Sequence, residues 1–232
     1  MKALVLLPLL LVSPALAGEF KAPEGCQSVM TVQSRGCYLA NYYTCEANPG
    51  DLFRVDFDQQ GPFYLSRIDS ETQWIESTDL GDNTVQTLDP GAMDPASFTG
   101  LLETGFDGFV FSLSKTKGEH SNVRGFDRLT GVTVVTDGVT LDQTEYEYTE
   151  TDDQGNILRQ SRGNEYILRD QRTFLSGSSE WWDGQNWLPL EGSPVDFAFP
   201  GEKGFEATQP IFDCDAVMSQ FFDEKDPSHD NL

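Results

Sequence analysis

Residues 26–45 read CQSVMTVQSRGCYLANYYTC and hold three of the four cysteines of the chain. The stretch is rich in β-branched and aromatic residues, which favour strands. In its middle, Arg35-Gly36 predicts a two-residue turn, because glycine adopts the positive φ that such a turn needs. Residues then pair symmetrically about the turn, so that Val32 faces Leu39. The stretch therefore predicts a β-hairpin, and with it a mainly β, antiparallel fold.

The same register places Cys26 opposite Cys45. Directly opposed strand residues have Cβ atoms about 4.5–5.5 Å apart, which is close to the roughly 3.5–4.5 Å of a disulfide. Four cysteines in an exported chain indicate two disulfides, with three possible connectivities. The register favours Cys26–Cys45 and leaves Cys37–Cys214, which ties the hairpin to the C-terminal end of the chain.

Export is indicated by residues 1–17, which match a secretory signal peptide. Lys2 supplies the charged region, residues 3–12 the apolar core, and Ala15-Leu16-Ala17 the cleavage site. The apolar run is too short to span a bilayer, and no longer run follows, so we expect no transmembrane segment. We therefore predict a periplasmic or secreted protein that ends in a disordered acidic tail over residues 223–232.

Acidic residues dominate the composition. The chain has 38 Asp and Glu against 15 Lys and Arg, and a formal net charge of −23. Such a surface repels nucleic acid and anionic membranes, so neither is an expected partner.

No metal or cofactor is expected. No cysteine pair has the two-residue spacing of a zinc site, and His120 and His229 lie far from the cysteines. Residues 79–83 and 152–156 are rich in Asp and Asn, but they lack the spacing of a calcium loop. Such clusters are typical of turns.

Short runs of alternating apolar and polar residues fill most of the chain, separated by Gly, Asn and Asp turns. Asp137-Gly138, between two β-branched runs, is the clearest hairpin signal, and residues 165–175 predict one long strand. We expect a single all-β domain over residues 18–222, an antiparallel meander of about ten to twelve strands with two short helices. So long a sheet curls or splits. An open half-barrel is the first expectation, and a closed barrel or a sandwich is the alternative.

The first helix is predicted where the alternation stops. Asp94-Pro95 favours a helix start, Phe98 and Leu101 share one helical face, and Gly105 favours a helix end. The second helix is predicted over residues 216–222.

No catalytic residue is predicted. The serines of residues 176–179 lack the strand, turn and helix of an esterase elbow. Glu145 and Glu147 share a strand face at a separation that suits glycosidases. On the expected turn, however, Glu145 faces Arg162, which indicates an ordinary cross-strand ion pair.

Trp181, Trp182 and Trp187 are the candidate ligand-binding residues. Neighbours in a strand point to opposite faces, so Trp181 and Trp182 cannot enter one core. Trp182 and Trp187 flank a turn and suit a platform for a sugar ring or a peptide, although a buried position is the alternative.

Several stretches of the sequence resemble those of a known group of proteins. Residues 105–131, with Asp137-Gly138, and the later residues 199–205 and 212–214 resemble uncharacterised exported proteins of alphaproteobacteria. That resemblance implies export and no particular activity. At the level of the fold alone, an exported meander with a mid-chain helix is similar to the periplasmic lipoprotein carriers, which hold acyl chains on a concave apolar face. Fold similarity of this kind does not imply function.

These observations favour a non-enzymatic periplasmic protein, a binding or carrier module that holds an apolar, lipid or peptide ligand on a curved sheet. A carboxylate-type hydrolase acting on a cell-envelope or sugar substrate is the first alternative. A structural or interaction protein of the envelope is the second.

Overall fold

A computed structural model, which describes residues 18–215, folds the chain into one thirteen-stranded antiparallel sheet. The strands are β1 (Cys26–Ser34), β2 (Tyr38–Cys45), β3 (Leu52–Asp58), β4 (Gly61–Ile68), β5 (Trp74–Asp79), β6 (Thr84–Leu88), β7 (Phe106–Lys115), β8 (His120–Thr136), β9 (Val139–Thr151), β10 (Ile157–Leu168), β11 (Thr173–Trp182), β12 (Trp187–Glu191) and β13 (Pro194–Ala198). Strands β1 to β12 are ordered as in the chain, and β13 is added beside β1. The antiparallel meander is confirmed, with more strands than the expected ten to twelve.

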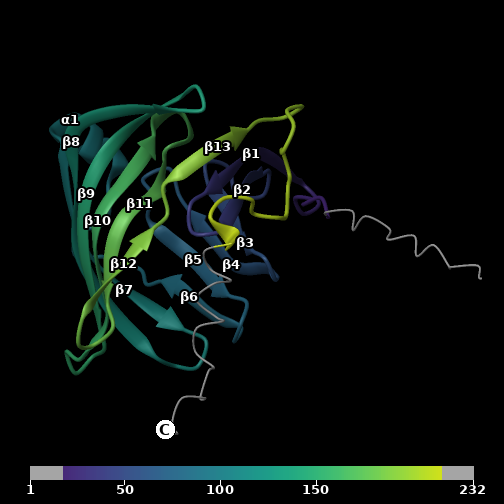
Figure 1. Cartoon of the computed structure of the whole chain (residues 1–232). Helices are drawn as coiled ribbons and strands as arrows, with labels where there is room; N and C mark the ends of the chain where they lie inside the picture. The colour runs from purple at the N-terminus through teal and green to yellow at the C-terminus, as the bar shows by residue number, and fades with distance from the viewer. Residues whose placement is uncertain (1–17, 216–232) are drawn as a thin grey trace, which may run out of the picture.

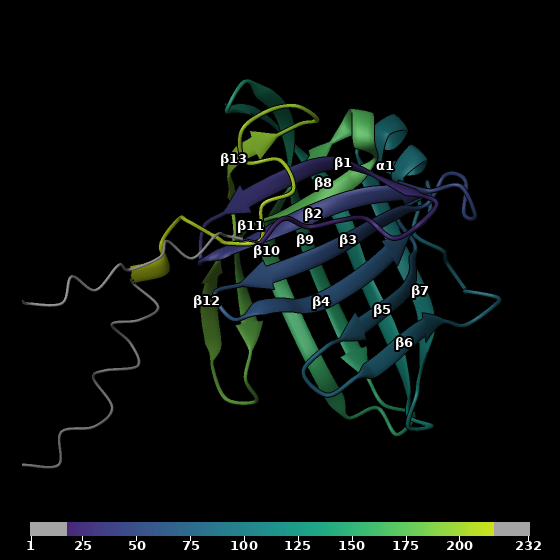
Figure 2. The ribbon, with the colours of Figure 1, turned by 90° about the vertical axis from the view of Figure 1, so that its right-hand side faces the viewer.

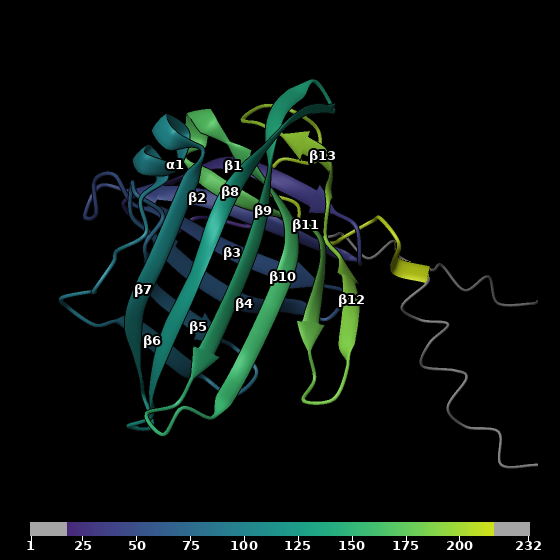
Figure 3. The same ribbon diagram turned by 90° about the vertical axis from the view of Figure 1, so that its left-hand side faces the viewer.

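The sheet is strongly curved (Figure 1). Strands β1–β6 form one wall, seen from outside in Figure 2, and β7–β12 form the facing wall, seen in Figure 3. The chain passes directly from β12 at one edge to β13 at the other, yet these two strands do not pair. The sheet is therefore open, as the half-barrel expectation requires, and neither the closed barrel nor the sandwich is formed.

The first hairpin differs from its predicted register. Its turn has three residues, 35–37, because Cys37 takes a left-handed φ of 60° and leaves the strand. Val32 consequently faces Ala40, and not Leu39. A bulge between Ser28 and Met30 shifts the pairing back by one residue. Two irregularities thus compensate each other before the cysteine pair is reached.

Both expected disulfides are present, Cys26–Cys45 and Cys37–Cys214. Cys26 and Cys45 are register partners at the open end of the hairpin. The amide of Cys37 donates a hydrogen bond of 3.0 Å to the carbonyl of Phe212. The turn is thus fixed to the segment that follows β13, which explains why Cys37 leaves the ladder.

Residues 165–175 do not form the single strand that the sequence predicts. β10 ends at Leu168, a 3-10 turn covers Arg169–Gln171, and β11 begins at Thr173. Arg172 has a left-handed φ of 46°, and its guanidinium donates hydrogen bonds to the Ser70 carbonyl at 2.6 Å and to Glu71 at 2.8 Å. These distant partners fix the turn, which divides the predicted strand between the end of β10 and the start of β11.

Helix α1 (Phe98–Thr104) begins later than predicted, because Ser97 and not Asp94 is its N-cap. Gly105, with a φ of 81°, ends the helix as expected. Phe98 is buried, and its ring lies 5.7 Å from that of Phe174. α1 thus covers one end of the space between the two walls, as Figures 2 and 3 show.

Three predicted segments lie outside the described residues: the signal peptide, the second helix over residues 216–222 and the C-terminal tail. Within residues 18–215, no helix is long and apolar enough to cross a membrane.

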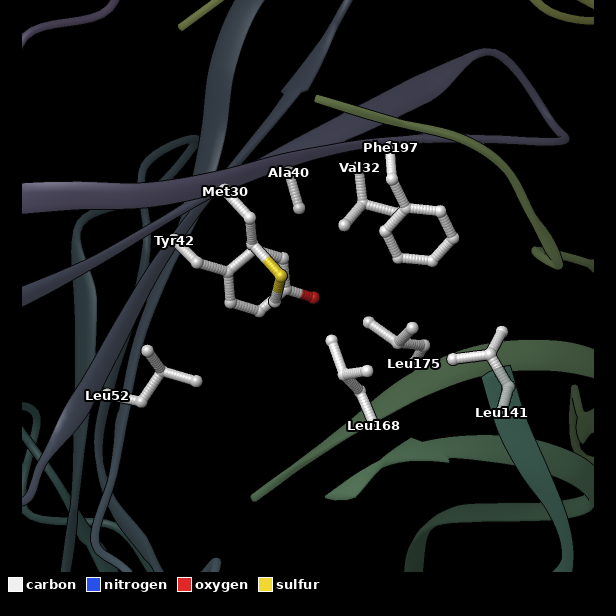
Figure 4. Packing of buried hydrophobic residues seen from close by; sticks show 9 residues of the cluster. All are labelled: Met30, Val32, Ala40, Tyr42, Leu52, Leu141, Leu168, Leu175 and Phe197. Atoms are coloured by element: carbon white, nitrogen blue, oxygen red, sulfur yellow. The ribbon is translucent and has the colours of Figure 1, made fainter. Parts of the chain in front are cut away.

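The main apolar core lies where the two walls meet (Figure 4). Side chains from β1, β2, β3 and β13 face leucines from β9, β10 and β11 across the concave side of the sheet. Its buried members are Met30, Val32, Ala40, Tyr42, Leu52, Leu141, Leu168, Leu175 and Phe197. Burial of this set joins strands that are far apart in the sheet order, and it holds the curvature.

The two disulfides are expected to contribute unequally to stability. They join residues separated by 177 and by 19 positions, and loop-closure entropy grows with the length of the closed loop. Cys37→Ser with Cys214→Ser should therefore lower the free energy of unfolding by about 2 kcal/mol more than Cys26→Ser with Cys45→Ser. Urea unfolding followed by circular dichroism measures both losses, and equal losses would contradict this expectation.

Gly125 is expected to tolerate no side chain. A Cβ atom at this position would lie 2.4 Å from the Glu147 carbonyl oxygen and 2.7 Å from the Phe109 ring. Gly125→Ala should destabilise the fold by about 1–3 kcal/mol through overpacking. Gly108→Ala is the matched control, because its nearest neighbour would be at an ordinary 3.6 Å. Thermal unfolding of the two variants compares them, and similar melting temperatures would show that the close packing at Gly125 is not limiting.

Candidate functional site

A cavity of about 360 Å³ lies between the two walls, on the concave face of the sheet. Strands from both walls contribute to it, and Phe174 and Ala96 line it near the end that α1 covers. Its lining includes the aromatic and charged side chains of Arg54, Trp74, Phe109, Phe111, Asp127, Tyr146, Tyr148, Glu150, Arg159 and Glu165. The cavity is thus a product of the curvature, and no single hairpin contains it.

Aromatic rings form one side of this cavity. Trp74 of β5 reaches across to the other wall, where its ring lies 5.2 Å from that of Phe111 and 5.5 Å from that of Tyr148. Phe109 lies against the same group, 6.5 Å from Trp74, and it fits there because Gly125 beneath it has no side chain. Aromatic clusters of this kind provide large apolar contact surfaces for a ligand.

Most charged groups at the cavity have a partner. Arg54 and Asp56, both on β3, form an ion pair of 3.0 Å. Lys115 and Glu150 form another, also of 3.0 Å. Burial raises the pKa of Glu150, but the nearby Ser121 hydroxyl group and the hydrogen-bonded Lys115 ammonium group outweigh it and hold that pKa below its usual value. These pairs are compensated within the protein and need no ligand.

Asp127 of β8 and Glu165 of β10 line the cavity without such a partner. Neither carboxyl group forms a hydrogen bond or an ion pair with another described residue. Burial raises the pKa of Glu165 to about 7, although the charge of Arg54 opposes this shift. Burial also raises the pKa of Asp127, and the charges of Glu165 and Asp107 add to it. Glu76 also lines the cavity without such a partner, but it is exposed, so Asp127 and Glu165 are the uncompensated acids in the shielded part of the cavity.

The predicted tryptophan platform lies elsewhere. Trp182 and Trp187 are cross-strand partners with ring centroids 5.6 Å apart, and the Arg162 guanidinium lies 4.1 Å from the centre of the Trp187 ring. Trp181 points to the opposite face of β11 and is 43% exposed. None of the three lines the cavity, so their role in binding stays a prediction.

Glu145 and Glu147 lie on the outer face of β9, where both are exposed. The predicted pairing of Glu145 with Arg162 is wrong, because the turn has five residues, 152–156, and a bulge between Ile157 and Arg159 shifts the register by one more, so that Glu145 faces Asn164. Glu145 binds Arg128 at 2.8 Å, and Arg162 binds Glu180 at 2.9 Å. Glu145 and Glu147 line a second, more open hollow together with Arg162 and Glu180, whereas the carboxylates that enter the cavity between the walls include Asp127, Glu150 and Glu165.

His120 binds two carboxylates, Asp89 at 3.0 Å and Asp153 at 2.6 Å, and it does not line the cavity. Ser176 lines the cavity, but it lies within a strand and has no esterase-type turn. Over the described part of the chain, no three His, Cys, Asp or Glu side chains converge as metal ligands do.

Sequence reasoning missed Trp74, Asp127 and Glu165. One signal was present: Asp127 is in phase with Val123 and Gly125, so it points to the same face as a buried valine. An acid at an inward position is rare without a reason, because its charge is costly to bury.

No protein family, curated protein or solved structure matches this chain. The resemblance to exported alphaproteobacterial proteins stays a prediction.

The raised pKa of Glu165 predicts a pH-dependent effect of its removal. Between about pH 4.3, the usual pKa of a glutamate, and pH 7, the folded protein retains a proton that the unfolded chain has released. The contribution of Glu165 to the stability of the wild type therefore falls as the pH rises through this window. Glu165→Gln removes this dependence and should stabilise the fold at pH 8 by about 1–3 kcal/mol more than at pH 4.

Urea unfolding at several pH values measures this difference. Glu147→Gln, an exposed acid on the outer face of β9, is the matched control and should show little pH dependence. A stability change in Glu165→Gln that is the same at every pH would contradict the raised pKa.

Proposed function

We propose that this protein is a non-enzymatic binding or carrier protein that holds a small amphipathic ligand inside its curved sheet. The observation that carries the proposal is the cavity of about 360 Å³ with an aromatic side and a few convergent charged groups. This combination is typical of small-molecule sites, where apolar walls supply contact area and polar groups fix orientation.

The volume and the lining of the cavity restrict the size and the polarity of the expected ligand. Ligand pockets usually measure about 300–1,000 Å³, so this one suits a small molecule or the end of a longer one. Asp127, Glu165 and Arg159 on its lining are unfavourable to a purely apolar ligand such as a bare acyl chain. We therefore favour a ligand that combines an apolar body with at least one polar group.

Export to the periplasm or the medium is part of the proposal. Two disulfides suit an oxidising compartment, and the N-terminal residues match a signal peptide. A carrier in such a compartment would acquire its ligand outside the cytoplasm.

A carboxylate-type hydrolase is the second candidate, now with Asp127 and Glu165 in place of Glu145 and Glu147. The favouring observation is that both carboxyls enter one cavity and have raised pKa values, as a general acid requires. Turnover of chromogenic glycosides that is lost in Glu165→Gln would support this candidate, and it would contradict the non-enzymatic proposal.

Trp74 is expected to be essential for binding. Native mass spectrometry of protein isolated from its own host should show a bound small molecule. Trp74→Ala should weaken the retention of that molecule by about tenfold or more, because a large aromatic contact is lost.

Trp181→Ala is the matched control. Trp74 is 38% exposed and Trp181 is 43% exposed, but only Trp74 lines the cavity. Equal loss in both variants, or a ligand that stays bound without Trp74, would contradict binding in the cavity.

A further inference from the structure

The two uncompensated acids in the shielded part of the cavity are close in the sheet. Asp127 on β8 pairs directly with Tyr146 on β9, and Glu165 on β10 pairs with Thr144, two residues from Tyr146. Both carboxyl groups therefore lie near the side chain of Tyr146, whose hydroxyl group is hydrogen-bonded to that of Ser161 on β10 at 2.7 Å.

The other charged groups near this point each have a partner within the protein. Arg54 binds Asp56 at 3.0 Å, and Asp107 accepts a hydrogen bond of 2.9 Å from the amide of Ser97. Asp127 and Glu165 have no such partner among the described residues. A ligand that meets them gains most if it brings a positive charge, because a charge-assisted hydrogen bond is roughly twice as strong as a neutral one.

Aromatic faces surround the same region. Tyr146 stacks on Tyr148 with ring centroids 6.3 Å apart, and Tyr148 contacts Trp74 at 5.5 Å. Aromatic faces attract cations through the negative charge of the π-system, and they recognise alkylammonium groups in particular. An anionic group would be repelled by the negative charge of this pair, and a neutral group would supply no counter-charge when the pair loses its proton.

We propose that the ligand is an organic cation, an amine with an apolar or aromatic body, whose ammonium group lies between Asp127 and Glu165. Its apolar body contacts Trp74, Phe109 and Phe111. This inference rests on the proposed binding function and specifies the class of ligand.

Protons compete with such a ligand. The groups that face the two acids are Arg54 from β3, Asp107 from β7 and Tyr146 from β9. Burial and mutual repulsion favour a proton on the Asp127–Glu165 pair in the empty site. A bound ammonium group replaces that proton, so binding releases a proton near neutral pH and weakens as the pH falls.

Three analogues with one apolar body test the inference: phenylbutylammonium, phenylbutanol and phenylbutyrate. Calorimetric titration at about pH 7.5 should show the ammonium compound binding at least about tenfold more tightly than the alcohol, and the carboxylate more weakly than either. The affinity for the ammonium compound should fall by about tenfold at pH 5, while that for the alcohol stays constant.

Two double variants test whether Asp127 and Glu165 cause the preference for the ammonium compound. Asp127→Asn with Glu165→Gln should reduce the preference for the ammonium compound over the alcohol to about twofold or less, with alcohol binding retained. Glu145→Gln with Glu147→Gln removes two acids from the outer face of β9 and should leave the preference intact. This control separates the site from general attraction to a chain of net charge −23. Circular dichroism and melting temperature verify the fold of each variant.

The results distinguish failure of the cation inference from failure of the proposed binding function. If the ammonium compound and the alcohol bind equally, or if the preference survives in the Asp127→Asn, Glu165→Gln variant, the cation inference is overturned while the proposed binding function stands. If none of the three compounds binds, the proposed function itself is overturned, and the inference with it.

Discussion

The sheet has to cover its own concave face, and the rest of the structure depends on this constraint. Only one short helix is available to the described chain, and it covers one end. Inward side chains of β1–β3 must therefore find partners on β9–β11, far away in the sheet order, as the core cluster does. Pairing of β13 with β1 and the Cys37–Cys214 disulfide fix the curvature that brings these strands together.

The cavity follows from the same constraint. Two walls of one continuous sheet meet where Met30, Leu141 and Leu168 pack into one cluster (Figure 4). Elsewhere between the walls Trp74 contacts Tyr148 across a cavity, and charged residues such as Asp127 and Arg54 line that cavity. Full apolar collapse is therefore opposed by the cost of burying these charges. A solvent-accessible site on the concave face is the result.

Particular residues show how far sequence reasoning reached. It predicted the Cys26–Cys45 disulfide correctly. Between the turn and Met30, however, the observed strand pairing differs from the predicted one by one residue, and the bulge between Ser28 and Met30 restores the predicted pairing. It missed the turn at Arg172, because that turn is fixed by hydrogen bonds to Ser70 and Glu71 about a hundred positions away, and such non-local contacts leave no local pattern. For the site, the spacing of residues on one strand indicated Glu145, whereas the cavity takes its acids from different strands.

The sequence by itself determined the class of fold, the antiparallel order of strands and the two disulfides, because alternation, turn residues and cysteine positions act over short distances along the chain. Only the tertiary structure decided that the sheet stays open and that Asp127, Glu165 and Trp74 line one cavity. Those features depend on curvature summed over thirteen strands. Small twists at each strand pair add up to that curvature, and no single segment encodes it.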